Sequence, residues 1–134
     1  MLRSLLMFLL MTAPVVAVQA DQHDRTEIEA NQLKSFYDKN EEMVILDARS
    51  KPYFDGTLLP HAKWVPFDSA ESEIKALIPS KNSLVIVYCA GVGCPASGWL
   101  YDRLTAMGYK HVYEYGGGLS DWQARKLPTV NQQG

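Results

Sequence analysis

The sequence predicts an α/β fold with a mostly parallel central sheet of about five strands and helices on both of its faces. Strand-like and helix-like segments alternate along the chain, as in folds with parallel sheets. Two apolar runs, Met43–Leu46 and Leu84–Tyr88, are continuous rather than alternating, which is typical of strands buried on both faces. At 134 residues, 47% of them hydrophobic, the chain is long enough for one well-packed domain.

The N-terminal half contains short elements separated by clear breaks. Leu33, Phe36 and Tyr37 recur at helical spacing, whereas prolines and a glycine interrupt the region after the first buried run. The expected elements are, in order, a short edge strand at Thr26–Glu29, a helix capped by Asn31 and running through Tyr37, a strand at Met43–Leu46, a loop over Arg49–Pro60, a short strand at Lys63–Val65 and a helix over Ser69–Ile78.

The C-terminal half has the most strand-like segment of the chain, Leu84–Tyr88. The helix after it has Pro95 just inside its start and Gly108 just past its end, an asymmetry common in helices. The expected elements that follow are a strand at His111–Tyr115, a turn at Gly116–Gly118, a short helix over Leu119–Ala124 and a tail over Lys126–Gly134.

Residues 1–20 have the composition of a secretory signal peptide. Arg3 precedes an apolar stretch, and Ala20 ends the stretch before polar residues begin. The stretch is short for a membrane-spanning helix and contains Pro14. We therefore expect cleavage after Ala20, a leader over residues 21–25, a domain over 26–128 and a C-terminal tail over 129–134. The mature protein is then expected to be periplasmic or secreted, with no membrane attachment.

Charge and composition exclude several functions. The formal net charge is −2 and Lys and Arg form no cluster, which argues against nucleic-acid binding. Two cysteines without a nearby histidine make a poor zinc site, so no metal is expected. No cofactor is expected either.

Cys89 is the candidate catalytic residue. It directly follows the best strand, and ligands of such folds bind beyond the carboxyl ends of the strands. A helix follows the loop, and a helix N-terminus lowers the pKa of a nearby thiol. Gly91 and Gly93 allow successive backbone N–H groups to point at one anion. The alternative is a buried structural thiol.

Cys94 lies five residues after Cys89 in what is expected to be an oxidising compartment. A disulfide closing so small a ring stabilises the fold little, so the spacing suits reversible redox chemistry better. Cys94 is therefore a possible resolving residue that attacks a persulfide or sulfenic acid on Cys89. The alternative is that Cys94 only fills the loop before Pro95.

Five segments, in order, resemble motifs of the rhodanese family. They are Asp47-Ala-Arg49 after an early strand; Tyr53 to Pro66, with its Gly, His, Ala and Pro; Val87-Tyr-Cys89 with its loop; Gly108-Tyr-Lys-His-Val112; and Gly117-Gly118-Leu-Ser-Asp-Trp122, followed by Leu127-Pro128. The resemblance covers residues 26–128 and implies a rhodanese-like fold.

The resemblance also implies a sulfurtransferase. The cysteine would take sulfane sulfur from thiosulfate or a persulfide, hold it as a Cys89 persulfide, and pass it to a thiol or to cyanide. The partners are then a small sulfur-containing substrate and a thiol acceptor, with a protein persulfide acceptor or a thiol reductant also open. The residues matched to the anion-binding loop are Ala90, Gly91, Val92, Gly93, Pro95, Ala96 and Ser97.

This chain departs from the family pattern in its loop. Common single-domain members have a six-residue loop closing on an arginine or similar residue and a serine. With Ser97 matched to that serine, the loop here is about two residues longer, contains Cys94 and has no Lys or Arg between Ala90 and Ala96. Anions would then be held by backbone amides alone. Asp47 and Arg49 lie at the same sheet edge, and Arg49 is open to two roles: steering an anionic substrate, or a structural ion pair with Asp47 or Asp55.

Three functions follow from these observations. The first is the sulfurtransferase, the second a thiol–disulfide redox protein cycling Cys89–Cys94, and the third a catalytically silent binding module. A cysteine phosphatase would need an arginine six residues after the cysteine, and Pro95 stands there.

Overall fold

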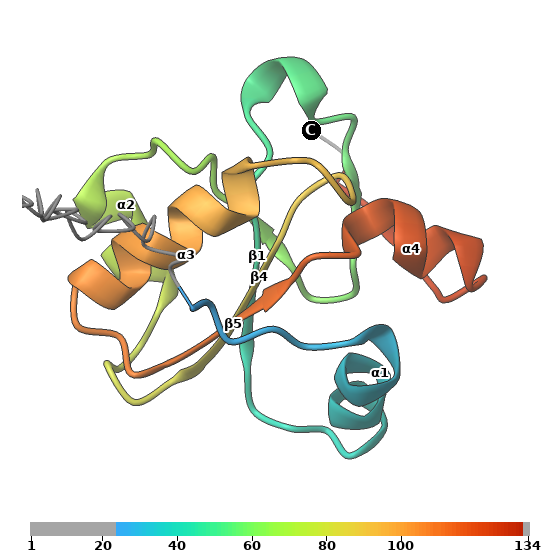
Figure 1. Cartoon of the computed structure of the whole chain (residues 1–134), viewed down its shortest axis with the longest axis horizontal. Coiled ribbons are helices and arrows are strands. Elements are labelled where there is room, and N and C mark those ends of the chain that lie inside the picture. The colour runs from blue at the N-terminus through green and yellow to red at the C-terminus, as the bar shows by residue number, and fades with distance from the viewer. Residues whose placement is uncertain (1–23, 133–134) are drawn as a thin grey trace, which may run out of the picture.

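A parallel sheet with helices on both faces forms the centre of the computed structural model, which describes residues 24–132 (Figure 1). The sheet has four strands in the order β3-β1-β4-β5. Their bounds are β1 Val44–Asp47, β3 Lys63–Trp64, β4 Leu84–Tyr88 and β5 His111–Tyr115. All three strand pairs are parallel, with Leu46 opposite Val87 and Val87 opposite Glu114 across the centre. The predicted fold class is confirmed.

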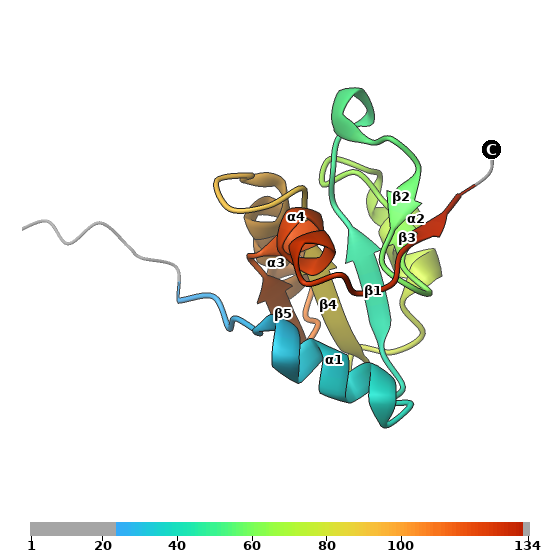
Figure 2. The same ribbon diagram turned by 90° about the vertical axis from the view of Figure 1, so that its right-hand side faces the viewer.

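Alternate residues of the strands enter two separate cores. Leu46, Val85 and Val87 pack with α2 (Glu71–Leu77) and α3 (Ala96–Ala106). Ile45, Ile86 and Tyr88 pack with α1 (Ala30–Asp38) and α4 (Gly118–Ala124) on the other face. In Figure 1 the sheet lies between α2 and α3 on one side and α1 and α4 on the other, and in Figure 2 α1 and α4 face the viewer. The continuous apolar run of β4 thus reflects burial on both sides.

The edges of the sheet differ from the expectation of about five strands. The segment expected as an edge strand, Thr26–Glu29, forms a single parallel bridge, Glu27 with Glu114. The Ile28 N–H donates to the Glu114 carbonyl at 3.0 Å and the Glu114 N–H donates to the Thr26 carbonyl at 2.8 Å. The extended segment ends there because α1 begins at Ala30 and buries Ala30 and Leu33.

Two helix starts also differ. Asn31 does not cap α1: the helix begins at Ala30, after Glu29, and has no side-chain cap. Burial of Ala30 decides this start, not the capping preference of Asn31. Pro95 lies one residue before α3, where its carbonyl accepts a hydrogen bond from the Trp99 N–H at 3.1 Å. Gly108 follows the end of α3 with φ +93°, as its predicted position requires.

The segment expected to be a tail is part of the fold. Val130–Asn131 forms β6, which pairs antiparallel with β2 (Thr57–Leu58), within the region expected to be a loop. The loop also contains a 3₁₀ turn, η1 (Lys51–Tyr53). Figure 2 shows β2 and β6 side by side at one edge of the molecule. The predicted signal peptide, residues 1–20, lies outside the described residues. Within residues 24–132, no helix is long and apolar enough to cross a membrane.

Candidate active site

The strand order produces a crevice at the carboxyl ends of β1 and β4. The chain leaves β1 toward β3 and leaves β4 toward β5, so the two connections diverge from neighbouring strands. Ligands of open α/β sheets bind at such a switch point. A hollow of about 430 Å³ lies there. It is lined by Arg49, Ser50, Tyr53, Phe67, Cys89, Ala90, Cys94, Pro95, Ala96 and Trp99.

Cys89 directly follows β4 and is joined to Cys94 by a disulfide, with the two Cα atoms 6.1 Å apart. Cys89 is only 2% exposed, whereas Cys94 is half-buried. The backbone of this segment is held by α4: the Leu119 N–H donates to the Cys89 carbonyl at 3.0 Å, and the Ser120 N–H donates to the Ala90 carbonyl at 2.9 Å. The first N–H groups of α4 therefore fix the position of the cysteine.

Two glycines allow this close approach of α4 to the loop. A Cβ on Gly118, whose φ is +61°, would lie 2.5 Å from the Cys89 carbonyl oxygen and 2.8 Å from the Gly91 nitrogen. A Cβ on Gly91 would collide with the Ser120 side chain. The glycine run before α4 thus brings a backbone turn against the cysteine loop, which explains why side chains are absent there.

Asp47 and Arg49 form a buried ion pair, the second of the two alternatives for Arg49. Asp47 is fully buried and Arg49 is 3% exposed. The Arg49 Nη2 donates to Asp47 Oδ2 at 2.7 Å, and Nε donates to both carboxylate oxygens at 3.0–3.1 Å. The same guanidinium donates to the carbonyls of Thr57 and Tyr53 and to Asp55 Oδ1.

This pairing determines the charge of the hollow. Burial opposes the charged form of Arg49, but the hydrogen bonds and negative charge of Asp47 outweigh it and raise the guanidinium pKa above its ordinary value. Arg49 therefore stays charged, yet each of its side-chain nitrogens already donates to an acceptor within the protein. Its charge is balanced by Asp47 and Asp55. Arg49 thus forms part of the wall and offers little to an anionic substrate.

The predicted loop residues separate into two groups. Ala90, Pro95 and Ala96 line the hollow with the cysteines, whereas Gly91, Val92 and Gly93 line a second hollow on the other side of the loop. Ser97, matched to the family serine, faces neither: it is 2% exposed and its Oγ donates to Glu114 Oε1 at 3.0 Å. Ser97 therefore links α3 to β5.

The hollow has an aromatic rim of Tyr53, Phe67 and Trp99 that was not predicted from the sequence. Trp99, on α3, is 47% exposed and its ring lies 4.8 Å from that of Phe67. Arg103 holds the Phe67 segment by donating to the carbonyls of Phe67 and Ser69, both at 2.7 Å. Tyr53, from η1, is 74% exposed. The available signal was that Tyr53 and Phe67 each follow the end of a strand, β1 and β3, by a few residues.

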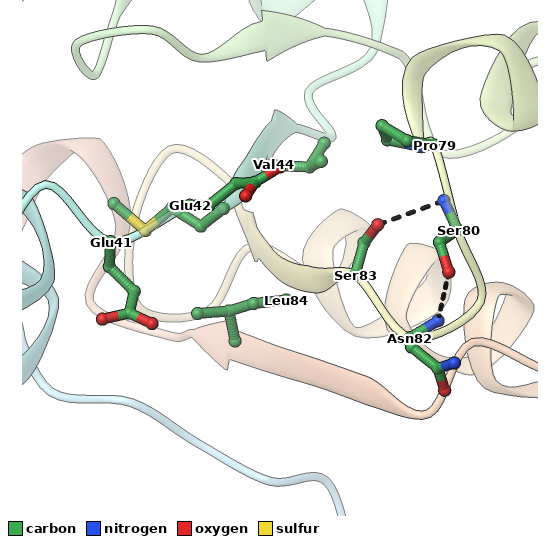
Figure 3. Close-up of a pocket in the computed structure, with 9 residues that line it drawn as sticks. Glu41, Glu42, Val44, Pro79, Ser80, Asn82, Ser83 and Leu84 are labelled. Atoms are coloured by element: carbon green, nitrogen blue, oxygen red, sulfur yellow. Dashed lines mark hydrogen bonds between the residues drawn. The ribbon is translucent and has the colours of Figure 1, made fainter.

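A further hollow lies at the opposite edge of the sheet, where β1 and β4 begin (Figure 3). Glu41, Glu42 and Leu84 are among the residues that line it. The hydroxyls of Ser80 and Ser83 accept hydrogen bonds from backbone N–H groups of the same turn, so they stabilise that turn. Within the described part of the chain, no three His, Cys, Asp or Glu side chains could hold a metal ion.

A rhodanese-like domain model matches residues 29–125, nearly all of the described region. The chain belongs to the rhodanese-like domain family. No curated protein matches it.

Solved structures of the same fold agree with this assignment. A rhodanese with anions from E. coli is 31% identical over 67% of this chain and 99% of its own, with a TM-score of 0.55. The Alr3790 protein of Anabaena is 27% identical over 78% of this chain and 80% of its own, at a TM-score of 0.67. A thiosulfate sulfurtransferase from Pseudomonas aeruginosa, 23% identical, matches over 83% of this chain but 21% of its own, at a TM-score of 0.70.

Replacing Arg49 with Met should strongly destabilise the domain, because the buried Asp47 carboxylate loses its ion pair. Breaking a buried pair costs about 3–5 kcal/mol. As a control, Lys34→Ala removes an exposed pair with Asp38 and should cost at most about 0.5 kcal/mol. Denaturant unfolding of the oxidised proteins measures both, and equal losses would contradict this account.

Replacing Gly118 with Ala should disturb the cysteine loop, whereas Gly108→Ala should not. Both glycines have positive φ, so each variant incurs backbone strain of about 1–2 kcal/mol. Only at Gly118 does the new Cβ meet the backbone of Cys89 and Gly91, which adds an overpacking cost of about 1–3 kcal/mol. Unfolding midpoints and the alkylation rate of reduced Cys89 provide the readouts. A normal alkylation rate in Gly118→Ala would show that α4 does not position the cysteine.

Proposed function

We propose that this protein is a sulfurtransferase that carries sulfane sulfur on Cys89. The observation that carries the proposal is the position of Cys89: it follows β4 at the switch point of a rhodanese-like domain and lines the hollow there. In the first step, the Cys89 thiolate attacks the outer sulfur of thiosulfate or of a persulfide. Sulfite or a thiolate leaves, and Cys89 holds the transferred sulfur as a persulfide.

The surroundings of Cys89 support this step. The Cys89 side chain packs in the same core as Ala96, the first residue of α3. A helix N-terminus stabilises a nearby thiolate over the thiol. The loop lines the hollow at both of its ends, at Ala90 and at Cys94 to Ala96, and its backbone N–H groups can bind the terminal sulfur of the persulfide. The persulfide then passes its outer sulfur to a thiol or to cyanide.

Cys94 provides a second reaction by which the Cys89 persulfide is consumed. Its thiolate attacks the Cys89 Sγ, forming the Cys89–Cys94 disulfide and expelling the outer sulfur as hydrosulfide. The oxidising equivalent comes from the sulfane sulfur, which is reduced, so no further oxidant is needed. The bond between the two cysteines supports this step because it places Cys94 within reach of Cys89. A thiol reductant then restores both thiols by disulfide exchange.

The disulfide also favours a second candidate, a thiol–disulfide redox protein that cycles Cys89–Cys94 without handling sulfane sulfur. Both candidates suit an oxidising compartment, and the signal-like residues 1–20 support export to the periplasm or beyond the cell.

Incubating the reduced protein with a sulfane donor should add about 32 Da, one sulfur atom, to Cys89. Thiosulfate and a small organic persulfide should be tested separately by mass spectrometry. Cys89→Ser should abolish the adduct. Cys94→Ser should accumulate it, because the intramolecular attack that releases hydrosulfide is lost. No adduct from either donor, in either Cys89-containing protein, would contradict the sulfurtransferase.

The reduction potential of Cys89–Cys94 tests the cycle with Cys94. A bond that turns over should equilibrate with thiol buffers at a potential above about −300 mV. Redox titration followed by alkylation of the free thiols measures the potential. A value far below that would show that the bond is structural and would remove both the resolving role of Cys94 and the redox candidate.

A further inference from the structure

Three of the four large exposed apolar side chains of the described region lie around the disulfide. Among residues 24–132, four large hydrophobic side chains are exposed: Tyr53, Val92, Trp99 and Val130. Tyr53 and Trp99 line the hollow that contains Cys89 and Cys94, and Val92, 91% exposed, lies in the loop between the cysteines. Apolar groups concentrated at one place on a surface mark a binding site rather than random exposure.

The hollow on the Trp99 side suits an apolar side chain. Its volume is about 430 Å³, and Arg49 is the one charged residue in its wall. Because the Arg49 guanidinium already donates to Asp47, Asp55 and two carbonyls, the wall has no cation ready for an anionic ligand. Pockets of this size and apolar lining bind apolar groups of a ligand.

The other side of the loop is acidic. A second hollow, of about 460 Å³, is lined by Gly91, Val92 and Gly93 together with the carboxylates of Glu27, Glu29, Glu114 and Asp121. Arg125 is the one basic residue of this lining, and it pairs with Asp121 at 3.0 Å. Arg25 lies 3.8 Å from Glu114. Carboxylates therefore outnumber the cations, and the field here attracts cations and repels anions.

Cys94 lines both hollows, whereas Cys89 lines only the hollow on the Trp99 side. It is half-buried, whereas Cys89 is 2% exposed. A thiol approaching the oxidised protein therefore reaches the Cys94 sulfur first. Attack there forms a bond from the partner sulfur to Cys94 Sγ and releases Cys89 as a thiolate. A second partner thiol then attacks the partner sulfur of this mixed disulfide, leaving an oxidised partner and two protein thiols.

We propose that the partner that reduces Cys94 is a cysteine in a polypeptide, with an apolar residue beside it and Lys or Arg residues flanking it. The apolar residue enters the Trp99 hollow, and the basic residues lie over the carboxylates of the second hollow. The inference rests on the proposed cycle through the Cys89–Cys94 disulfide. It explains how an uncharged loop with an acidic neighbour selects a reductant other than a small anionic thiol.

Four blocked peptides, each with one cysteine, test the proposal. They carry either leucine or serine beside the cysteine and either lysines or glutamates as flanks. The rate at which each peptide reduces the oxidised full-length protein is divided by its rate with hydroxyethyl disulfide, which corrects for thiol reactivity. The leucine–lysine peptide should be faster than the serine–glutamate peptide by about tenfold or more. Equal normalised rates, or a faster acidic peptide, would overturn the proposal.

Matched variants separate the contribution of the apolar hollow from that of the carboxylates. Trp99→Ala should lower the leucine-over-serine preference, whereas Val130→Ser, which changes an exposed apolar residue at β6, should leave it intact. Glu27→Gln/Glu29→Gln should lower the lysine-over-glutamate preference. Glu41→Gln/Glu42→Gln makes the same charge change at the opposite edge of the sheet and should not (Figure 3). Equal effects of site and control variants would contradict the assignment of these surfaces.

The attacked sulfur can be identified directly. After brief reaction with excess leucine–lysine peptide, acid quench and alkylation, the peptide should be attached to Cys94 and the alkyl group to Cys89. The reverse pattern would overturn the attack on Cys94.

Failure of this inference is distinguishable from failure of the sulfurtransferase. If the four peptides reduce the protein at equal normalised rates but Cys89 still gains a sulfur adduct, only the proposed partner is contradicted. If the rates differ as expected but no adduct forms, only sulfur transfer is contradicted. If dithiothreitol also fails to reduce the disulfide, both the cycle and the partner are overturned.

Discussion

The ion pair between Asp47 and Arg49 determines both the shape and the charge of the switch-point hollow. A carboxylate as deeply buried as Asp47 needs a full set of donors, and Arg49 supplies them from two residues along the chain. To do so, the guanidinium also binds the carbonyls of Tyr53 and Thr57, which fixes the segment that forms one wall. The same bonds leave the hollow without an available cation. The fixed wall of the hollow and its lack of an available cation therefore have one physical cause.

The elements that the sequence predicted well are those decided by burial over several residues. β4 matches its predicted bounds because five consecutive apolar residues have no other favourable environment. The end of α3 matches because Gly108 adopts a positive φ. The elements it missed are decided by contacts distant in sequence. β6 is two residues long and exists only because β2 offers a free edge, so no local pattern could indicate it.

In the candidate site, too, features with a local sequence signal were predicted and contacts between distant residues were missed. The position of Cys89 followed from a strand end and a topology, both of which leave a local signal. Trp99 falls within the helix predicted after Pro95, but only the three-dimensional structure shows that its side chain stays 47% exposed, with its ring 4.8 Å from that of Phe67. Likewise, the partner of Ser97 is Glu114, 17 residues away on β5, and a motif match could not reveal it.

Cys89 also connects the two layers of the protein. Its side chain belongs to the core shared with α2 and α3, while its carbonyl is held by the first turn of α4 on the opposite face. Reduction of the disulfide releases the loop on one side only, since the hydrogen bond to α4 does not involve sulfur. The hydrogen bond from the Leu119 amide therefore holds the backbone of Cys89 independently of the bond from its sulfur to Cys94.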